Sequence, residues 1–81
     1  MMSTMTDTLE RVIKVTAEVL KVDVNTIQES SRFVEDLGAE SVQSIELVAA
    51  YEEEFGIEMD EDQALAVKSV GDAVRFIDSI R

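Results

Sequence analysis

The chain has 81 residues, and its 18 acidic and 7 basic residues give a net charge of −11. This balance argues against nucleic acid and anionic membranes as partners, because phosphate contacts need Lys and Arg. Cysteine and histidine are absent, which excludes disulfides, thiolate metal sites and the commonest general base near neutral pH. We therefore expect a single domain, residues 1–81, that is not an enzyme.

Residues 1–6 are expected to be a frayed lead-in, with Thr6 as the N-cap of the first helix. Apolar side chains then recur at helical spacing as far as Leu20, which predicts a helix from Asp7 to Lys21. The N-terminal segment has neither the cationic start nor the apolar core of a signal peptide. No apolar run reaches the ~18 residues of a membrane span, so a cytoplasmic protein is expected.

The segment from Lys21 to Glu40 is long and weakly periodic, and we expect an ordered loop that packs across the helices. One short turn is predicted near residues 25–29. Gly38 is expected to take a positive φ, which lets the chain turn into the next helix. Four apolar side chains are expected to anchor this loop by pointing inward: Val24, Ile27, Phe33 and Leu37.

Three further helices are predicted from their stripes and caps. A helix from Ser41 to Phe55 ends at Gly56, a natural C′ residue. A short helix from Glu61 to Ala66 follows a capping-box pattern, and a last helix runs from Val70 to Ile80. Ile57 and Met59 are expected to plug the core from a loop. The predicted fold class is all-α: a small four-helix bundle of three long helices and one short one, with a long loop between the first two main helices.

Ser41 stands where the predicted helix 41–55 begins, and its hydroxyl has two interpretations. As an N-cap it would stabilise the helix by roughly 0.5–2 kcal/mol. As a chemical handle it would hold a phosphodiester at the positive end of the helix, near free N–H donors. Ser44, one turn along, is the comparison: a polar residue on a helix surface.

The uninterrupted frame from Glu35 to Phe55, which reads EDLGAESVQSIELVAAYEEEF, resembles the acyl carrier proteins. In that family an Asp-Ser-Leu attachment motif follows a Glu-Asp-Leu-Gly loop and precedes an acidic helix. Here Glu40 stands for the Asp and Val42 for the Leu. The resemblance implies that 4′-phosphopantetheine is attached to Ser41. It also implies that acyl groups travel as thioesters on that arm, for fatty acid, polyketide or specialised lipid synthesis.

Eleven carboxylates and no Lys or Arg lie between Phe33 and Val67. The ordinary interpretation is a solvated surface. A surface that carries only negative charge can also attract partners with basic surfaces, and this attraction depends on salt. The resemblance implies partners with Lys/Arg patches, namely a phosphopantetheinyl transferase and acyl-processing synthases, and a monomeric carrier. It implies that four glutamates dock on them: Glu40, Glu46, Glu52 and Glu53.

The apolar stripes also have two interpretations. As ordinary core they comprise Val12, Val19, Ile45, Val48, Tyr51, Met59, Ala64, Leu65, Val70, Val74 and Ile77. The resemblance implies that part of this core opens between the second and third helices to sheath an acyl chain, eased by small residues such as Ala49. The pocket candidates are Ile45, Val48, Tyr51, Met59 and Ala64.

No metal site is expected despite the carboxylates. An EF-hand loop that began at Asp36 would need Gly at its sixth position and Glu at its twelfth, where the chain has Ser41 and Leu47. Two alternatives to a carrier stay open. One is an acidic helical interaction module without a prosthetic group, and the other is an enzyme, which the residue inventory supports poorly.

Overall fold

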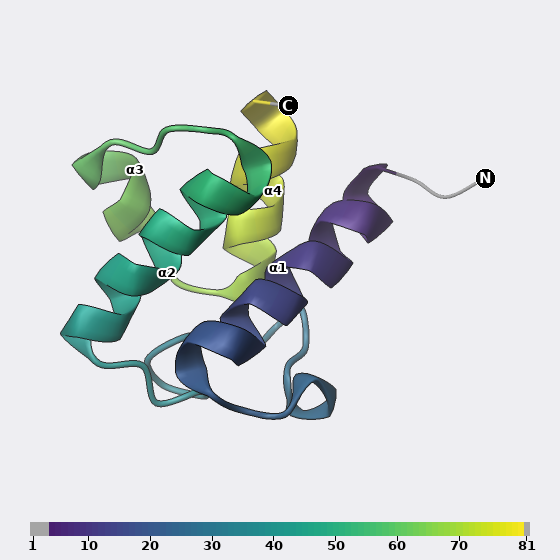
Figure 1. Cartoon of the computed structure of the whole chain (residues 1–81), viewed down its shortest axis with the longest axis vertical. Coiled ribbons are helices and arrows are strands. Elements are labelled where there is room, and N and C mark those ends of the chain that lie inside the picture. The colour runs from purple at the N-terminus through teal and green to yellow at the C-terminus, as the bar shows by residue number, and fades with distance from the viewer. Residues whose placement is uncertain (1–3, 81) are drawn as a thin grey trace.

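Four α-helices and one 3₁₀ turn make up the part of the chain that the computed structural model describes, residues 4–80 (Figure 1). The α-helices are α1 (Thr4–Leu20), α2 (Ser41–Phe55), α3 (Glu61–Ala66) and α4 (Val70–Ile80), and the turn is η1 (Val24–Thr26). The predicted all-α bundle is confirmed, with three long helices, one short helix and a long first connection.

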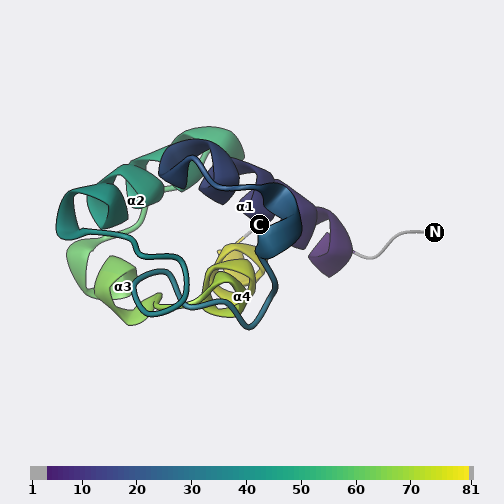
Figure 2. The ribbon, with the colours of Figure 1, turned by 90° about the horizontal axis from the view of Figure 1, so that it is seen from below.

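The core lies where α1 packs against both α2 and α4. Seen from below, α1 and α2 lie along one side of the bundle, and α3 and α4 lie along the other (Figure 2). The short α3 has no buried residue of its own, whereas α4 buries five. The most deeply buried side chains come from the three long helices: Thr8, Val12, Thr16, Tyr51, Val70, Val74 and Ile77.

The first helix differs from the prediction at both ends. It already includes Thr4, so Thr6 is not the N-cap and residues 4–6 are helical, while residues 1–3 lie outside the described part of the chain. It ends at Leu20, and Lys21 takes a left-handed conformation with φ 58°. The Val22 N–H reaches back to the Ala17 carbonyl at 3.1 Å, which closes the helix in the same way as a glycine would.

The end of α2 and the start of α3 follow the predicted pattern, and α4 is also capped at its start. Gly56 is left-handed with φ 65°, and the Ile57 N–H donates to the Glu52 carbonyl. Asp60 and Gln63 form a capping box at the start of α3, with both hydrogen bonds present. The Ser69 hydroxyl accepts the Asp72 N–H at 3.1 Å before α4.

The long connection between α1 and α2 is ordered and is held by the chain that joins α3 to α4. The Phe33 N–H donates to the Lys68 carbonyl and the Val70 N–H donates to the Ser31 carbonyl, both at 3.0 Å. Together these bonds form an isolated antiparallel bridge between Arg32 and Ser69. The predicted turn is displaced, since η1 spans Val24–Thr26 and not residues 25–29.

Gly71 lets this crossing segment come close to α4. Its N–H donates to the Glu29 carbonyl at 2.8 Å, and a Cβ at this position would lie 3.2 Å from that same oxygen. The glycine in the first turn of α4 is therefore explained by a close backbone approach, which its position near the helix start alone did not indicate.

Most of the side chains predicted for the core are buried or half-buried, but three are exposed. Ile27 and Phe33 anchor the connection as expected, and Met59 is buried from its loop. Val24 is 47% exposed, however, and Ile45 and Leu65 are 70% and 68% exposed. Val42, which continues the apolar stripe of α2, is 66% exposed. The short α3 covers too little of α2 to bury Val42 and Ile45, and its own Leu65 is also exposed, so an apolar face is left open to solvent.

Candidate functional site

Ser41 is the first residue of α2, not its N-cap. The cap is Glu40, whose backbone is extended (φ −89°, ψ 169°) and whose N–H donates to Oε1 of Gln43 at 2.9 Å. The interpretation of Ser41 as an N-cap was therefore wrong. Its side chain is exposed, and among the described residues no hydrogen bond uses its hydroxyl. The hydroxyl is thus available at the end of a 15-residue helix where backbone N–H groups lack intrahelical partners.

The loop that presents Ser41 is anchored two residues earlier. Gly38 has the predicted positive φ, 72°, and the buried Ala39 donates its N–H to the Phe33 carbonyl at 2.8 Å. Asp36 closes the turn by accepting the Arg32 N–H at 2.8 Å and Arg32 Nε at 3.3 Å. These two bonds, the backbone one first, hold the pKa of the Asp36 carboxyl below its ordinary value.

A groove of about 640 Å³ lies beside Ser41, between α2 and α3. All five predicted pocket residues line it, although Ile45 does so as an exposed rim residue and not from the core. Ala49 does not line it and is exposed, so the expectation that it eases opening was wrong. The lining comprises Phe33, Val34, Glu35, Ser41, Ser44, Ile45, Leu47, Val48, Tyr51, Met59, Glu61, Ala64, Leu65, Val67 and Lys68.

Tyr51 forms part of the floor of the groove, and contacts with Phe33 and with Thr16 of α1 fix its side chain. Tyr51 is 1% exposed, its ring centroid lies 6.4 Å from that of Phe33, and its hydroxyl meets the Thr16 hydroxyl of α1. The rim is mostly apolar and open, with Ile45 on α2 and Leu65 on α3. Ser41 also borders a second hollow of about 560 Å³, lined by Val34, Ala39, Glu40, Val42 and Ser44. The serine therefore lies between two depressions of the surface.

The four glutamates that were predicted to meet partners differ in their surroundings. Glu40, Glu46 and Glu53 are exposed. Glu52 is half-buried, and its carboxylate accepts the Met59 N–H at 2.9 Å, so it also fixes the loop that follows α2. Within residues 7–80 none of these four takes part in an ion pair.

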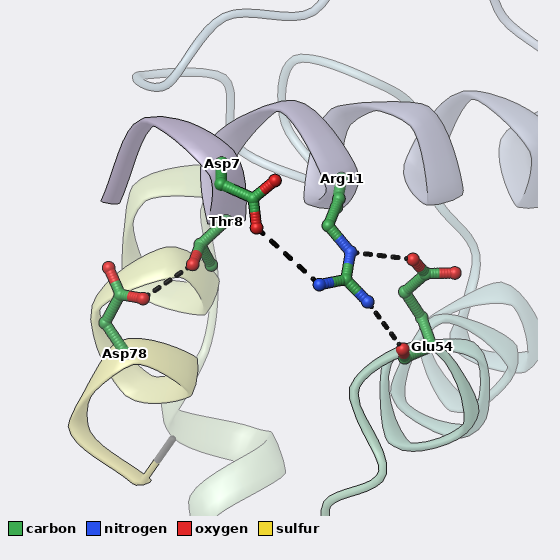
Figure 3. Close-up of polar contacts among 5 residues, drawn as sticks. All are labelled: Asp7, Thr8, Arg11, Glu54 and Asp78. Carbon is green, nitrogen blue, oxygen red and sulfur yellow. Dashed lines mark hydrogen bonds and ion pairs between the residues drawn. The ribbon is translucent and has the colours of Figure 1, made fainter. Parts of the chain in front are cut away.

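Arg11 neutralises the C-terminal end of α2, a contact that the sequence did not indicate (Figure 3). Its Nε lies 2.9 Å from the Glu54 carboxylate, and a second guanidinium nitrogen donates to the Glu54 carbonyl, also at 2.9 Å. Its Cζ lies 4.5 Å from the centroid of the Phe55 ring, and Asp7 approaches its third nitrogen at 3.6 Å. The cation offsets both a carboxylate and the negative end of the helix dipole.

Two negative findings bear on other classes of protein. No group of three or more potential metal-ligating side chains occurs in the described part of the chain. Each helix between residues 4 and 80 is too short or too polar to cross a bilayer.

Residues 10–77 match the family model of the phosphopantetheine attachment site. The chain belongs to this family of carrier proteins. The family attaches 4′-phosphopantetheine covalently to a serine, and its members carry acyl or peptidyl groups and do not catalyse their conversion. The match removes the enzyme alternative, and it implies that transferases and synthases are the carrier's partners.

The structure offers residues that fit the group. Ser41 combines an exposed hydroxyl, a helix start that favours a phosphate, and an apolar groove alongside. Ser44, the comparison residue, lines the same groove but is half-buried within α2.

Proposed function

We propose that this carrier holds its 4′-phosphopantetheine on Ser41 and serves as an acyl carrier in fatty acid, polyketide or specialised lipid synthesis. The observation that supports it best is an exposed serine hydroxyl at the first residue of α2, without an intramolecular partner among the described residues, on the rim of an apolar groove. When attached, the arm supplies the thiol that the chain lacks, on which acyl groups are held as thioesters.

The groove supports an acyl cargo. Its floor of Leu47, Tyr51 and Met59 is buried, and its rim residues Ile45 and Leu65 expose apolar surface that a hydrocarbon chain would cover. Burial of apolar surface contributes about 25 cal/mol per Å², so a chain laid in this groove is protected from solvent at a gain in free energy. The carrier thereby shields its cargo between partners.

The acidic face supports recognition by basic partners. Glu40 and Glu46 lie exposed within one turn and a half of Ser41, and Glu53 extends the same charge toward the end of α2. Long-range attraction to a Lys/Arg surface raises the rate of encounter and weakens at high salt. We infer that the carrier acts as a monomer, as a cytoplasmic protein, and that the transferase supplies the base that activates Ser41.

The experiment is a loading assay with coenzyme A and a transferase of broad specificity, read by intact-protein mass spectrometry. Wild type is expected to gain one phosphopantetheine, and Ser41→Ala none. Ser44→Ala is the matched control, because it removes a hydroxyl from the same helix and groove, and it is expected to load like wild type. Loading of Ser41→Ala would mean that the group is attached at another residue, and no loading of wild type would leave the acidic interaction module as the better account.

A further inference from the structure

Lys68 is the one basic side chain in the lining of the groove beside Ser41. It lies two residues after the end of α3 and is exposed. The five ion pairs between residues 7 and 80 use Arg11, Arg32 and Arg75, and none uses Lys68. A cation at the edge of a segment with eleven carboxylates, yet without an ion pair, is available to an anionic ligand.

Hydrogen bonds at both the carbonyl and the N–H of Lys68 fix its backbone. They therefore also fix the position from which its side chain extends. Its carbonyl accepts the Phe33 N–H at 3.0 Å, and its own N–H donates to the Asp72 carboxylate at 3.2 Å. Phe33 in turn accepts the Ala39 N–H at 2.8 Å, two residues before Ser41. Two consecutive backbone hydrogen bonds therefore connect Lys68 to the loop that presents Ser41.

The two carboxylates that line the groove form no ion pair with the lysine. Glu35 and Glu61 also line the groove, but Glu35 lies 3.9 Å from Arg32, and Glu61 lies in the first turn of α3. Glu40, next to Ser41, is exposed. Among the side chains that line the groove with Ser41, Lys68 carries the one positive charge, and the start of α2 adds partial positive charge at Ser41 itself.

We propose that Lys68 binds the phosphodiester of the prosthetic group across the mouth of the groove. The inference rests on attachment at Ser41, as proposed above. A phosphodiester on Ser41 Oγ carries one negative charge at the start of α2, and the flexible side chain of Lys68, which lines the same groove, supplies a compact positive charge to pair with it. Binding by Lys68 holds the phosphate end of the prosthetic group beside the groove. The attached cargo is thereby directed toward the apolar floor of the groove.

The test uses the loaded carrier and ³¹P NMR, with the attached phosphodiester itself as the probe. In wild type we expect a ³¹P resonance whose position changes between low and high sodium chloride, because salt screens the contact with Lys68. Lys68→Met is expected to lose that salt-dependent change, and Lys68→Arg to retain it. Lys14→Met, which removes an exposed lysine of α1 outside the groove lining, is expected to match wild type.

Loading also gives a readout on the lysine. Between the unloaded and loaded wild-type carrier we expect the ε-methylene resonances of Lys68 to shift and those of Lys14 to stay in place. A loaded carrier whose ³¹P resonance is the same in wild type and Lys68→Met overturns this inference and leaves the proposed function intact. A chain that takes up no phosphorus, or takes it up elsewhere than Ser41, overturns both.

Discussion

The Tyr51 hydroxyl lies 2.5 Å from the Thr16 hydroxyl and joins α2 to α1 beneath the floor of the groove. Thr16 Oγ1 also lies 2.7 Å from the Val12 carbonyl, which can only accept, so Thr16 donates there and Tyr51 donates to Thr16. Both side chains are buried, and burial raises the pKa of Tyr51 well above its ordinary value against the opposing effect of the Thr16 hydrogen bond. The neutral phenol is thus a fixed part of the floor.

The direction of this hydrogen bond predicts an unequal pair of substitutions. Tyr51→Phe removes the donor and leaves Thr16 bonded to Val12, so the free energy of unfolding should fall by about 0.5–1.5 kcal/mol. Thr16→Val leaves a buried phenol without an acceptor and should cost more, about 1–3 kcal/mol. Urea unfolding of both variants gives the comparison. Equal losses, or a larger loss for Tyr51→Phe, would contradict the assigned direction.

The groove predicts that cargo stabilises the carrier. Loading with a hydrophobic acyl group should raise the unfolding temperature of wild type, because each buried CH₂ contributes about 0.8 kcal/mol. Ala64→Phe fills the groove and should abolish most of this increase. Ala49→Phe places the same side chain on the exposed part of α2 and should retain it. Each variant is compared with its own unloaded form, and equal increases in both would argue against cargo in this groove.

The Asp36 turn predicts a pH-dependent contribution to stability. Because its folded-state pKa lies below the ordinary value of 3.8, the contribution is complete above that value and is lost as the pH falls through the lower folded-state pKa. Asp36→Asn should therefore lower the unfolding temperature at about pH 6, and its difference from wild type should shrink as the pH falls below 3.8. Asp62→Asn, an exposed aspartate of α3, controls for the change in net charge. A difference that persists unchanged into acid would contradict the prediction.

The Arg11 contacts predict a salt-sensitive link between α1 and the end of α2. Arg11→Met removes the Glu54 pair, a helix-terminal hydrogen bond and the stacking on Phe55, and it should reduce the free energy of unfolding by about 1 kcal/mol at low salt. Arg75→Met breaks a pair with Asp72 within one helix and should cost less than about 0.5 kcal/mol. Denaturant unfolding at two salt concentrations measures both. An Arg11 loss no larger than that of Arg75 would show that the contacts do not act together.

Helix bounds were predictable where a strong capping signal had no competing signal beside it. Gly56 and the Asp60/Gln63 box bracket α2 and α3, and both helices have the predicted bounds. The start of α1 was not predictable, because Thr4, Thr6 and Asp7 all favour helix starts and the pattern did not choose between them. Its end was displaced because Lys21 takes the left-handed position that usually indicates glycine.

The residues that line the groove were easier to predict than their exposure. The apolar stripe predicted a helix that begins at Ser41, and the resemblance to acyl carrier proteins implied the side chains that line the groove. Ile45 and Leu65 are exposed because the short α3 covers little of α2. The spacing of apolar residues along the chain carries no information about that coverage. The Arg32–Ser69 bridge and the Arg11–Glu54 pair join segments far apart in the chain, and no local signal predicts such contacts.

The most direct measurement is peptide-level mass spectrometry of the chain after co-expression with a phosphopantetheinyl transferase. After digestion, the account predicts that fragments with Ser41 carry the added phosphopantetheine and that fragmentation places it on that residue. Modification on any other serine, with Ser41 unmodified, would contradict the account.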